Sequence, residues 1–180
     1  MNGKSQTLDS TSIPEISGIK INGNIDSCSN KFLKKGYTFF KREDNVIVLK
    51  GKIGNDDVKL FLVSTPKTKL VWKGVIDFPE QDSWEDLKDK FGKIKGILID
   101  KYGTPSNDFH FFKSPYYEGD GYELTAVSNG NCVYSTYWTS SSCIVSVEIS
   151  SSKLISVGYE NEINDQINKQ ENDNQLKSGL

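Results

Sequence analysis

Hydrophobic residues between Ser83 and Pro105 recur three or four positions apart, which predicts one apolar face of an α-helix. The residues of this face are Trp84, Leu87, Phe91, Ile94 and Leu98. Ser83 can cap the start of the helix, and Asp86 stands where the reciprocal partner of a capping box belongs. Gly103 and Pro105 predict its end, because proline lacks the backbone N–H that a continuing helix requires.

A shorter helix is predicted from Ile25 to Lys35. Asn24 precedes it as a candidate N-cap, and Gly36 occupies the position where glycine commonly follows a helix. Its apolar face consists of Ile25, Cys28, Phe32 and Leu33. The sequence therefore predicts two amphipathic helices, each followed by a glycine and then by aromatic residues.

Most of the remaining chain alternates with a period of two or is rich in β-branched and aromatic residues, which is typical of strands. The predicted strands are residues 46–53, 58–64, 69–78, 109–112, 122–128, 131–138, 143–150 and 153–160. Asn129–Gly130 separates two of them, and Asn-Gly is the pair most favoured in two-residue hairpins. We therefore expect residues 122–128 and 131–138 to form a hairpin, and the sheet to be antiparallel.

The order of elements predicts an α+β fold, in which an antiparallel sheet of about six to eight strands carries two helices on one face. One helix precedes each group of strands, which suggests a two-fold pseudo-repeat of helix plus strands. Residues 1–17 and 161–180 are polar and lack periodicity, so we expect flexible tails there. A single α+β domain is then expected at residues 18–160.

Composition supports a packed core and disfavours several partners. The chain has 180 residues, 36 % of them hydrophobic, with nine Phe, eight Tyr and three Trp, so it can fold without a metal or disulfide. The net charge is −2 and Arg42 is the only arginine, which disfavours nucleic-acid binding. No segment approaches the roughly 20 apolar residues of a membrane span, so membrane insertion is not expected.

The cysteines and the chain start leave some alternatives open. Cys28, Cys132 and Cys143 form no CxxC motif, and we interpret them as small buried hydrophobic residues, although a Cys132–Cys143 disulfide is conceivable. No metal site and no cofactor are expected, since a glycine-rich phosphate loop before the second helix is also lacking. The first residues contain no apolar signal segment, which indicates a cytoplasmic protein if the chain is complete and an exported one if a signal was removed.

Candidate chemistry concentrates in the segment FHFFKSPYYEGDGYE, residues 109–123. His110 is the only histidine, and we interpret it as structural, with Phe112 on the same face of a short strand. No catalytic residue is assigned. Glu118, Asp120 and Glu123 could form the carboxylate pair of a hydrolase, but the same residues are ordinary turn material.

Aromatic side chains beside these carboxylates suggest a contact surface instead. We predict a binding surface that comprises Tyr116, Tyr117, Glu118, Asp120 and Trp138. Aromatic residues of this kind are frequent at protein interfaces and on sugar platforms. The alternative is that Tyr116 or Tyr117 covers the end of the sheet. On the second helix, Gly92 and Gly96 lie away from the apolar face and suggest close packing against another helix or a partner chain.

Four segments also resemble a family of small, uncharacterised, usually exported proteins of gut bacteria. These segments are INGNID (21–26), KKG (34–36), VLKGKIG (48–54) and W-x-x-L-K…L-x-x-K-Y-G-x-P (84–105), and the resemblance covers about residues 18–160. It implies a shared fold and an exported location, but no particular chemistry. The chain departs from the family in lacking the export signal with which its members usually begin.

Together these observations predict a non-enzymatic interaction module that binds a protein partner. Three alternatives remain: a carbohydrate-binding module, a carboxylate-based hydrolase, and a small protein inhibitor of an enzyme. The last rests on the analogy between two helix-plus-sheet units and small inhibitor proteins. The sequence does not identify the partner or the oligomeric state.

Overall fold

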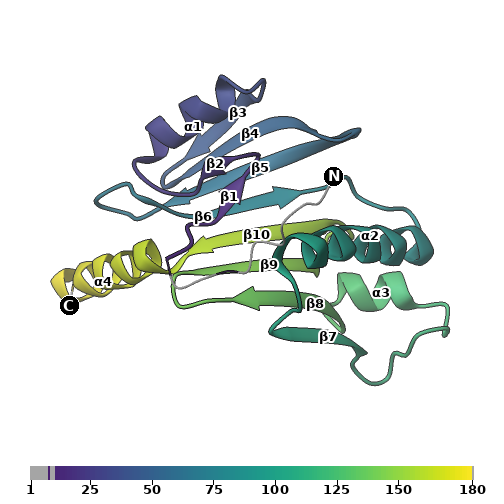
Figure 1. The fold of residues 1–180 in the computed structure, drawn as a ribbon. Helices are drawn as coiled ribbons and strands as arrows, with labels where there is room; N and C mark the ends of the chain where they lie inside the picture. Colours follow the sequence, from purple (N-terminus) through teal and green to yellow (C-terminus); the bar gives the residue numbers. More distant parts are fainter. Residues whose placement is uncertain (1–7, 9–10, 180) are drawn as a thin grey trace. The chain divides into compact units, whose positions relative to one another are not determined.

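The computed structural model describes residue 8 and residues 11–179, and within them the predicted α+β class is confirmed (Figure 1). The strands form an eight-stranded antiparallel sheet in the order β3-β4-β5-β6-β10-β9-β8-β7 and a separate two-stranded sheet. Four helices, α1 to α4, complete the described part of the chain.

The described chain divides into two compact units. The first contains residue 8 and residues 77–139 and 145–157, and the second contains residues 11–76, 140–144 and 158–179. Strand β10 (Ile155–Asn161) contributes residues to both units. Each unit contains one of the two predicted amphipathic helices, so the predicted common face of the two helices and the pseudo-repeat stay predictions.

In the first unit, helix α2 (Trp84–Tyr102) confirms the prediction made from residues 83–105. The Ser83 hydroxyl accepts a hydrogen bond from the Asp86 backbone N–H at 3.0 Å and donates to the Asp86 carboxylate at 2.6 Å. Gly103 ends the helix with φ +80°, a conformation that favours glycine. The caps and the apolar stripe together explain why this helix was predictable.

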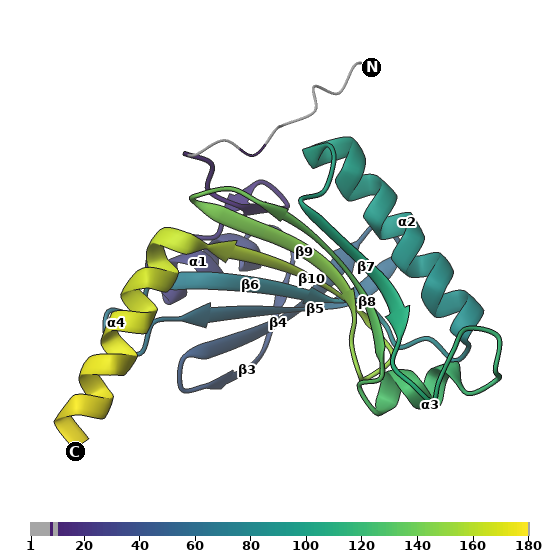
Figure 2. The same ribbon diagram turned by 90° about the horizontal axis from the view of Figure 1, so that it is seen from below.

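Helix α2 packs on strands β7 (Asn107–Phe112) and β8 (Cys132–Thr139) (Figure 2). Trp84 makes edge-to-face contacts with Phe112 and Tyr134, at centroid distances of 5.3 and 5.2 Å. Phe91 contacts Tyr134 in the same way at 5.7 Å. Strand β9 (Cys143–Ile149) carries buried residues at alternate positions from Cys143 to Ile149, as predicted.

The expected hairpin at Asn129–Gly130 is wrong, because residues Glu123–Ser128 form helix α3. Gly130 has φ +70°, but it ends this helix: its N–H donates to Val127 O, and the Asn131 N–H donates to Ala126 O. Asn-Gly serves helix ends as well as hairpins, since both need a positive φ. The six-residue segment ELTAVS is too short for its periodicity to distinguish a helix from a strand.

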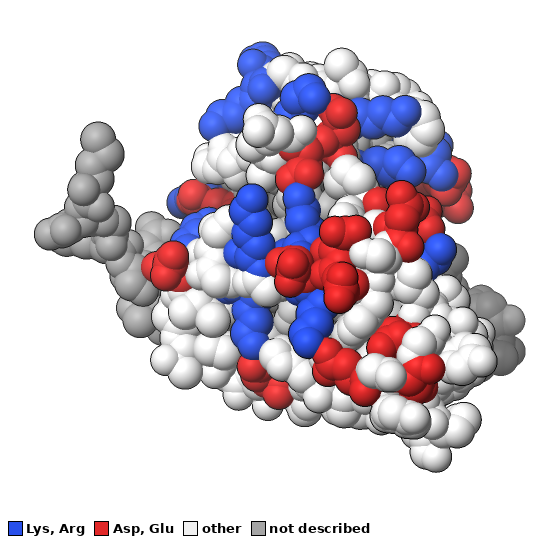
Figure 3. Space-filling model, turned by 90° about the vertical axis from the view of Figure 1, so that its right-hand side faces the viewer, with Lys and Arg blue, Asp and Glu red and all other residues white. Residues whose placement is uncertain are grey.

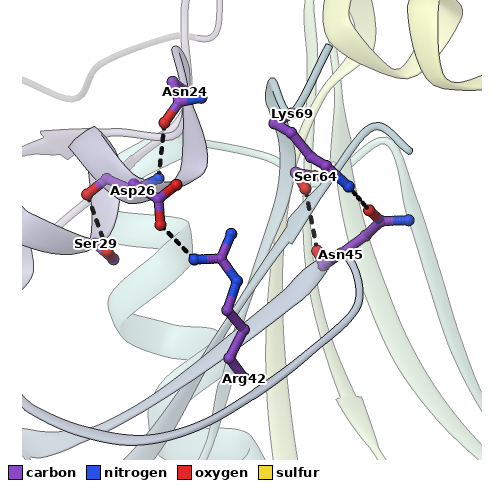
Figure 4. Close-up of polar contacts among 7 residues, drawn as sticks. All are labelled: Asn24, Asp26, Ser29, Arg42, Asn45, Ser64 and Lys69. Carbon is purple, nitrogen blue, oxygen red and sulfur yellow. Dashed lines mark hydrogen bonds and ion pairs between the residues drawn. The ribbon is translucent and has the colours of Figure 1, made fainter. Parts of the chain in front are cut away.

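In the second unit, helix α1 (Ile25–Leu33) confirms the other predicted helix and packs on β4 (Val46–Ile53) and β5 (Asp56–Ser64). Strand β3 (Thr38–Glu43) pairs with β4, and β6 (Val71–Asp77) follows β5 in the sheet. Figure 4 shows the side chain of Arg42, on β3, in an ion pair with Asp26 near the start of α1. The only arginine of the chain therefore joins the edge strand to the helix.

The N-terminal tail predicted over residues 1–17 is too long. Strands β1 (Glu15–Ile16) and β2 (Ile19–Lys20) pair antiparallel, and Ile16 is buried. The Ile21 N–H donates to Pro14 O at 2.8 Å. Residues 1–7, 9 and 10 lie outside the described residues. Two adjacent residues at positive φ, Ser17 and Gly18, make the turn of this short hairpin.

The predicted C-terminal tail also differs, because helix α4 (Glu162–Gly179) occupies residues 162–179. Polar residues anchor it. Asn164 is buried, and its amide N–H₂ donates to Val71 O at 2.7 Å and to the Asn22 side chain at 3.0 Å. The Asn161 side chain accepts from the Asn164 N–H and donates to Ile21 O. Hydrophobic periodicity could not predict this helix, since Ile163 points outward and is 58 % exposed.

The three cysteines are free and buried, as predicted. Burial raises the pKa of Cys132 to about 12, which keeps its thiol protonated at neutral pH. None of the helices formed by the described residues has both the length and the apolar character needed to cross a membrane.

The close packing predicted at Gly92 and Gly96 is wrong within the described chain. A Cβ on either residue would lie more than 4 Å from any neighbouring heavy atom outside the helix's own backbone. The two glycines therefore face open space, and the alternative of an approaching partner chain stays a prediction.

We expect Gly92→Ala and Gly96→Ala each to raise the free energy of unfolding by up to about 1 kcal/mol, because alanine loses less backbone entropy in a helix. Urea denaturation followed by circular dichroism measures the change. Gly103→Ala is the control and should destabilise the protein, since Gly103 has φ +80°. Destabilisation by the two helical substitutions would contradict the open surroundings of these sites.

We expect Asn164→Ala to lower the free energy of unfolding by about 1–3 kcal/mol, because it leaves the buried carbonyl of Val71 without this donor. Hydrogen exchange should show faster exchange of α4 amides. Asn174→Ala, at an exposed position of the same helix, should change the free energy of unfolding by no more than about 0.5 kcal/mol. It should leave the exchange of the α4 amides unchanged. Equal effects of the two substitutions would disprove the anchoring role of Asn164.

Candidate binding site

The predicted contact surface lies mainly in the loop of residues 113–122, which joins β7 to α3 in the first unit. The start of the loop is fixed to the end of α3: the Lys113 N–H donates to Asn131 O at 2.7 Å, and its ammonium group donates to Gly130 O at 3.1 Å. Gly119 and Gly121 both have positive φ, which allows the tight path of the chain between them.

Asp120 holds the tip of the loop. One carboxylate oxygen accepts from the Tyr117 N–H at 3.0 Å, and the other accepts from the Tyr122 N–H at 2.7 Å. This pattern is a local side-chain cap of the backbone, of the kind that Asp commonly makes in turns. Both oxygens of Asp120 are thus engaged in fixing the backbone of the two neighbouring tyrosines.

Two further carboxylates also hold the loop. Glu123 is buried at the start of α3, and its carboxylate accepts from the Gly119 N–H at 2.7 Å. Glu118 forms an ion pair with Lys88 of α2 and accepts from the Tyr134 hydroxyl at 3.1 Å. The hydrogen bond from Lys88 lowers the pKa of Glu118 below its usual value. The same loop therefore contacts both α2 and β8.

The tyrosines of the loop differ in exposure. Tyr117 and Tyr122 are 65 % and 64 % exposed, whereas Tyr116 is half-buried. The Tyr116 hydroxyl accepts from the Asn129 side chain at 3.4 Å, so Tyr116 packs beside the end of α3. Tyr116 is therefore partly covered beside α3, whereas Tyr117 has the exposure expected of a contact residue.

Trp138 does not belong to this surface. It is 2 % exposed, and its indole N–H donates to Gly103 O at 2.8 Å, directly after α2. Tyr102 contacts its ring at a centroid distance of 6.4 Å. The polar residues that follow Trp138 in sequence suggested exposure, but the side chain points to the face covered by α2.

A second polar group lies between β7, β8 and α2. Asp108 accepts from the Thr136 hydroxyl at 2.6 Å and pairs with Lys95 at 2.5 Å. The Nε2 atom of His110 lies 3.1 Å from Asp108 and 3.3 Å from the Lys95 ammonium group. The imidazole stacks on Tyr134 at a centroid distance of 4.8 Å. His110 is thus held by its neighbours on all of these elements.

Burial and the neighbouring charges together set the protonation of this group. Burial lowers the pKa of His110 below 6.5, and the positive charge of Lys95 lowers it further, while Asp108 acts in the opposite direction. For Asp108, burial raises the pKa, but the hydrogen bonds from Lys95 and Thr136 outweigh it and the net pKa is lowered. At neutral pH these lowered pKa values keep Asp108 as a carboxylate and the His110 imidazole neutral.

These contacts favour a structural role for the titratable groups. Histidine catalysis of the serine or cysteine type needs a nucleophile at the imidazole, whereas the contacts of Nε2 are with Asp108 and Lys95. A hydrolytic carboxylate must be free to meet a substrate, but Glu118 is paired with Lys88 and the Asp120 and Glu123 carboxylates accept hydrogen bonds from loop amides. In the described part of the chain, no group of three His, Cys, Asp or Glu residues is arranged to hold a metal ion.

The sequence did not indicate Tyr122, Lys88 or Lys95 as parts of the site. Tyr122 was assigned to a strand with residues 123–128, although it directly precedes α3. The two lysines lie on α2 seven positions apart, a spacing that places them on one side of the helix. That spacing was a usable signal, but their partners Glu118 and Asp108 are 30 and 13 positions away in sequence.

Comparisons of the chain with models of protein families, with curated proteins and with solved structures gave no match. The resemblance to exported proteins of gut bacteria stays a prediction from the sequence segments alone.

We expect the pKa of His110, measured by NMR from the imidazole shifts, to lie below 6.5 and to rise in Lys95→Gln. Because the unfolded state binds the proton more tightly, the free energy of unfolding should fall as the pH drops from 6.5 through the folded-state pKa. Lys93→Gln, on the same helix, is the control and should leave the pKa unchanged. A wild-type pKa above 6.5 would contradict the arrangement described.

Proposed function

We propose that the chain is a protein-binding module and that the loop of residues 113–122 contacts the partner through Tyr117 and Tyr122. The observation that carries this proposal is the combination of two exposed tyrosines with a backbone fixed between them by Asp120. Tyrosine supplies a large contact area with few rotatable bonds, and a fixed loop loses less entropy on binding.

The loop carboxylates support binding over hydrolysis. Asp120 and Glu123 accept hydrogen bonds from the loop backbone, and Glu118 is paired with Lys88. Each carboxylate therefore has a structural partner that a catalytic role would have to displace. We keep the carboxylate-based hydrolase as an alternative that this arrangement disfavours.

The surface charge supports a partner other than nucleic acid. Seen from the side where α2 and α3 lie in Figure 1, basic and acidic side chains are interspersed (Figure 3). Nucleic-acid surfaces instead cluster Lys and Arg along one face. A protein partner with an apolar pocket and hydrogen-bond acceptors at its rim fits the two tyrosine rings and their hydroxyl groups.

Two alternatives share the same surface. A carbohydrate-binding module would use the tyrosine rings as a platform, and an enzyme inhibitor would insert the loop into an active-site cleft. The inhibitor alternative draws on the proposed two-fold pattern, in which α1 precedes β3–β6 and α2 precedes β7–β10. Both alternatives require exposed aromatic residues on a fixed loop, so the identity of the captured partner distinguishes them.

The proposal is tested by capture on immobilised protein, identification of the bound partner by mass spectrometry, and calorimetry with the purified partner. Tyr117→Ala and Tyr122→Ala should each weaken binding by about 30-fold, the effect of removing a residue worth about 2 kcal/mol. Asp120→Ala keeps both rings but removes the hydrogen bonds that fix them, and it should weaken binding by a smaller factor.

Leu176→Ala is the matched control, because Leu176 is 64 % exposed and lies on α4 in the second unit. It should leave the affinity unchanged. Circular dichroism of each variant establishes that the fold is retained. A partner that binds the double variant Tyr117→Ala/Tyr122→Ala as tightly as the wild type would refute the proposed surface.

A further inference from the structure

The second unit contains a cavity with a volume of about 590 Å³ that has no part in the proposed function. It is lined by residues 35–38, after the end of α1, and by residues 50–52 and 57–59 of the β4–β5 hairpin. A volume of this size is typical of sites for small molecules.

The cavity lies where β4 loses its neighbour on one side. The pairing of β3 with β4 begins at Thr38 and Lys50, but the pairing of β4 with β5 continues to Ile53 and Asp56. In place of a strand, the Tyr37 ring packs on Gly51, where a Cβ would approach it to 2.4 Å. The glycine therefore allows the buried Tyr37 ring to pack closely on β4 where the pairing with β3 ends.

The lining carries a strong excess of positive charge. The charged residues of the lining are four lysines and one aspartate: Lys35, Lys50, Lys52, Lys59 and Asp57. The charge of Asp57 is matched by Lys52, whose ammonium group lies 2.8 Å away. The Lys35 ammonium group donates to the uncharged carbonyl of Ser17 at 2.6 Å. Three positive charges are thus left without a lining carboxylate.

Lys50 and Lys59 form the least favourable pair in this lining. They are directly opposite each other on β4 and β5, so both side chains project from the same face of the sheet. The Lys50 ammonium group lies 3.8 Å from the centroid of the Phe40 ring, a contact that leaves its charge uncompensated by an anion. Like charges directly opposite on neighbouring strands destabilise a sheet.

We propose that this cavity binds a small, multiply charged oxyanion of the phosphate class between Lys50 and Lys59. Such an anion would accept hydrogen bonds from both ammonium groups and remove their mutual repulsion. A monovalent anion would leave part of the repulsion, so the site should select for at least two negative charges.

The test uses inorganic pyrophosphate, added at constant ionic strength to the ¹⁵N-labelled full chain and followed by NMR. We expect saturable shifts confined to residues 35–38 and 50–59. Lys50→Gln and Lys59→Gln should each weaken binding by about tenfold or more, as expected for a lost hydrogen bond to a charged group. Lys177→Gln, on α4, is the matched control and should bind as the wild type does.

A stability measurement provides an independent readout. Without added anion at low salt, Lys59→Gln should melt at a higher temperature than the wild type, because the repulsion with Lys50 is removed. Pyrophosphate should stabilise the wild type and leave this variant almost unaffected. Vesicles of phosphatidylcholine with phosphatidic acid then distinguish the two sources of the anion. They should retain the protein if its ligand is a lipid headgroup, and they should not retain it if the ligand is a soluble oxyanion.

The absence of saturable shifts with pyrophosphate would overturn the proposal. So would shifts of equal size in the wild type and in Lys50→Gln/Lys59→Gln, because they would indicate general binding to surface lysines. These outcomes do not bear on the tyrosine surface, which lies in the other unit.

Discussion

The hydrogen bonds from the loop backbone to its own carboxylates are the interaction on which the proposed function depends. Asp120 fixes the amides of Tyr117 and Tyr122, and Glu123 fixes that of Gly119. These carboxylates give the loop amides the acceptors that hold its shape. Because the acceptors are used in this way, the acidic residues organise the aromatic ones, and the exposed rings are the groups left to meet a partner.

Polar anchoring recurs in the second unit, where it explains what the sequence could not predict. Helix α2 was predictable because its apolar stripe and both of its ends follow general rules. Helix α4 was not, since its buried contacts come from Asn164 and its neighbour Asn161, whose partners lie about 90 to 140 positions earlier in the sequence. Side chains that bind distant carbonyls leave no periodic pattern in the chain.

The candidate site shows the same limit. The segment containing Tyr117, Glu118 and Asp120 could be found from composition. Its surroundings could not, because helix α3 follows it in place of the expected hairpin. Trp138 was assigned to the surface because polar residues follow it, but the burial of a strand residue depends on which face of the sheet a helix covers. Periodicity gives the two faces of a strand and does not reveal which of them α2 covers. The cavity of the second unit was also not predictable, because it depends on the strand register that places Lys50 opposite Lys59.

Hydrogen exchange of the loop amides in the free protein tests the central claim most directly. The account predicts measurable protection of the Tyr117, Gly119 and Tyr122 amides in the wild type. In Asp120→Ala, protection of Tyr117 and Tyr122 should be lost while that of Gly119, bonded to Glu123, persists. Exchange of all three wild-type amides at the rate of an unstructured peptide would contradict a fixed loop and with it the proposed binding surface.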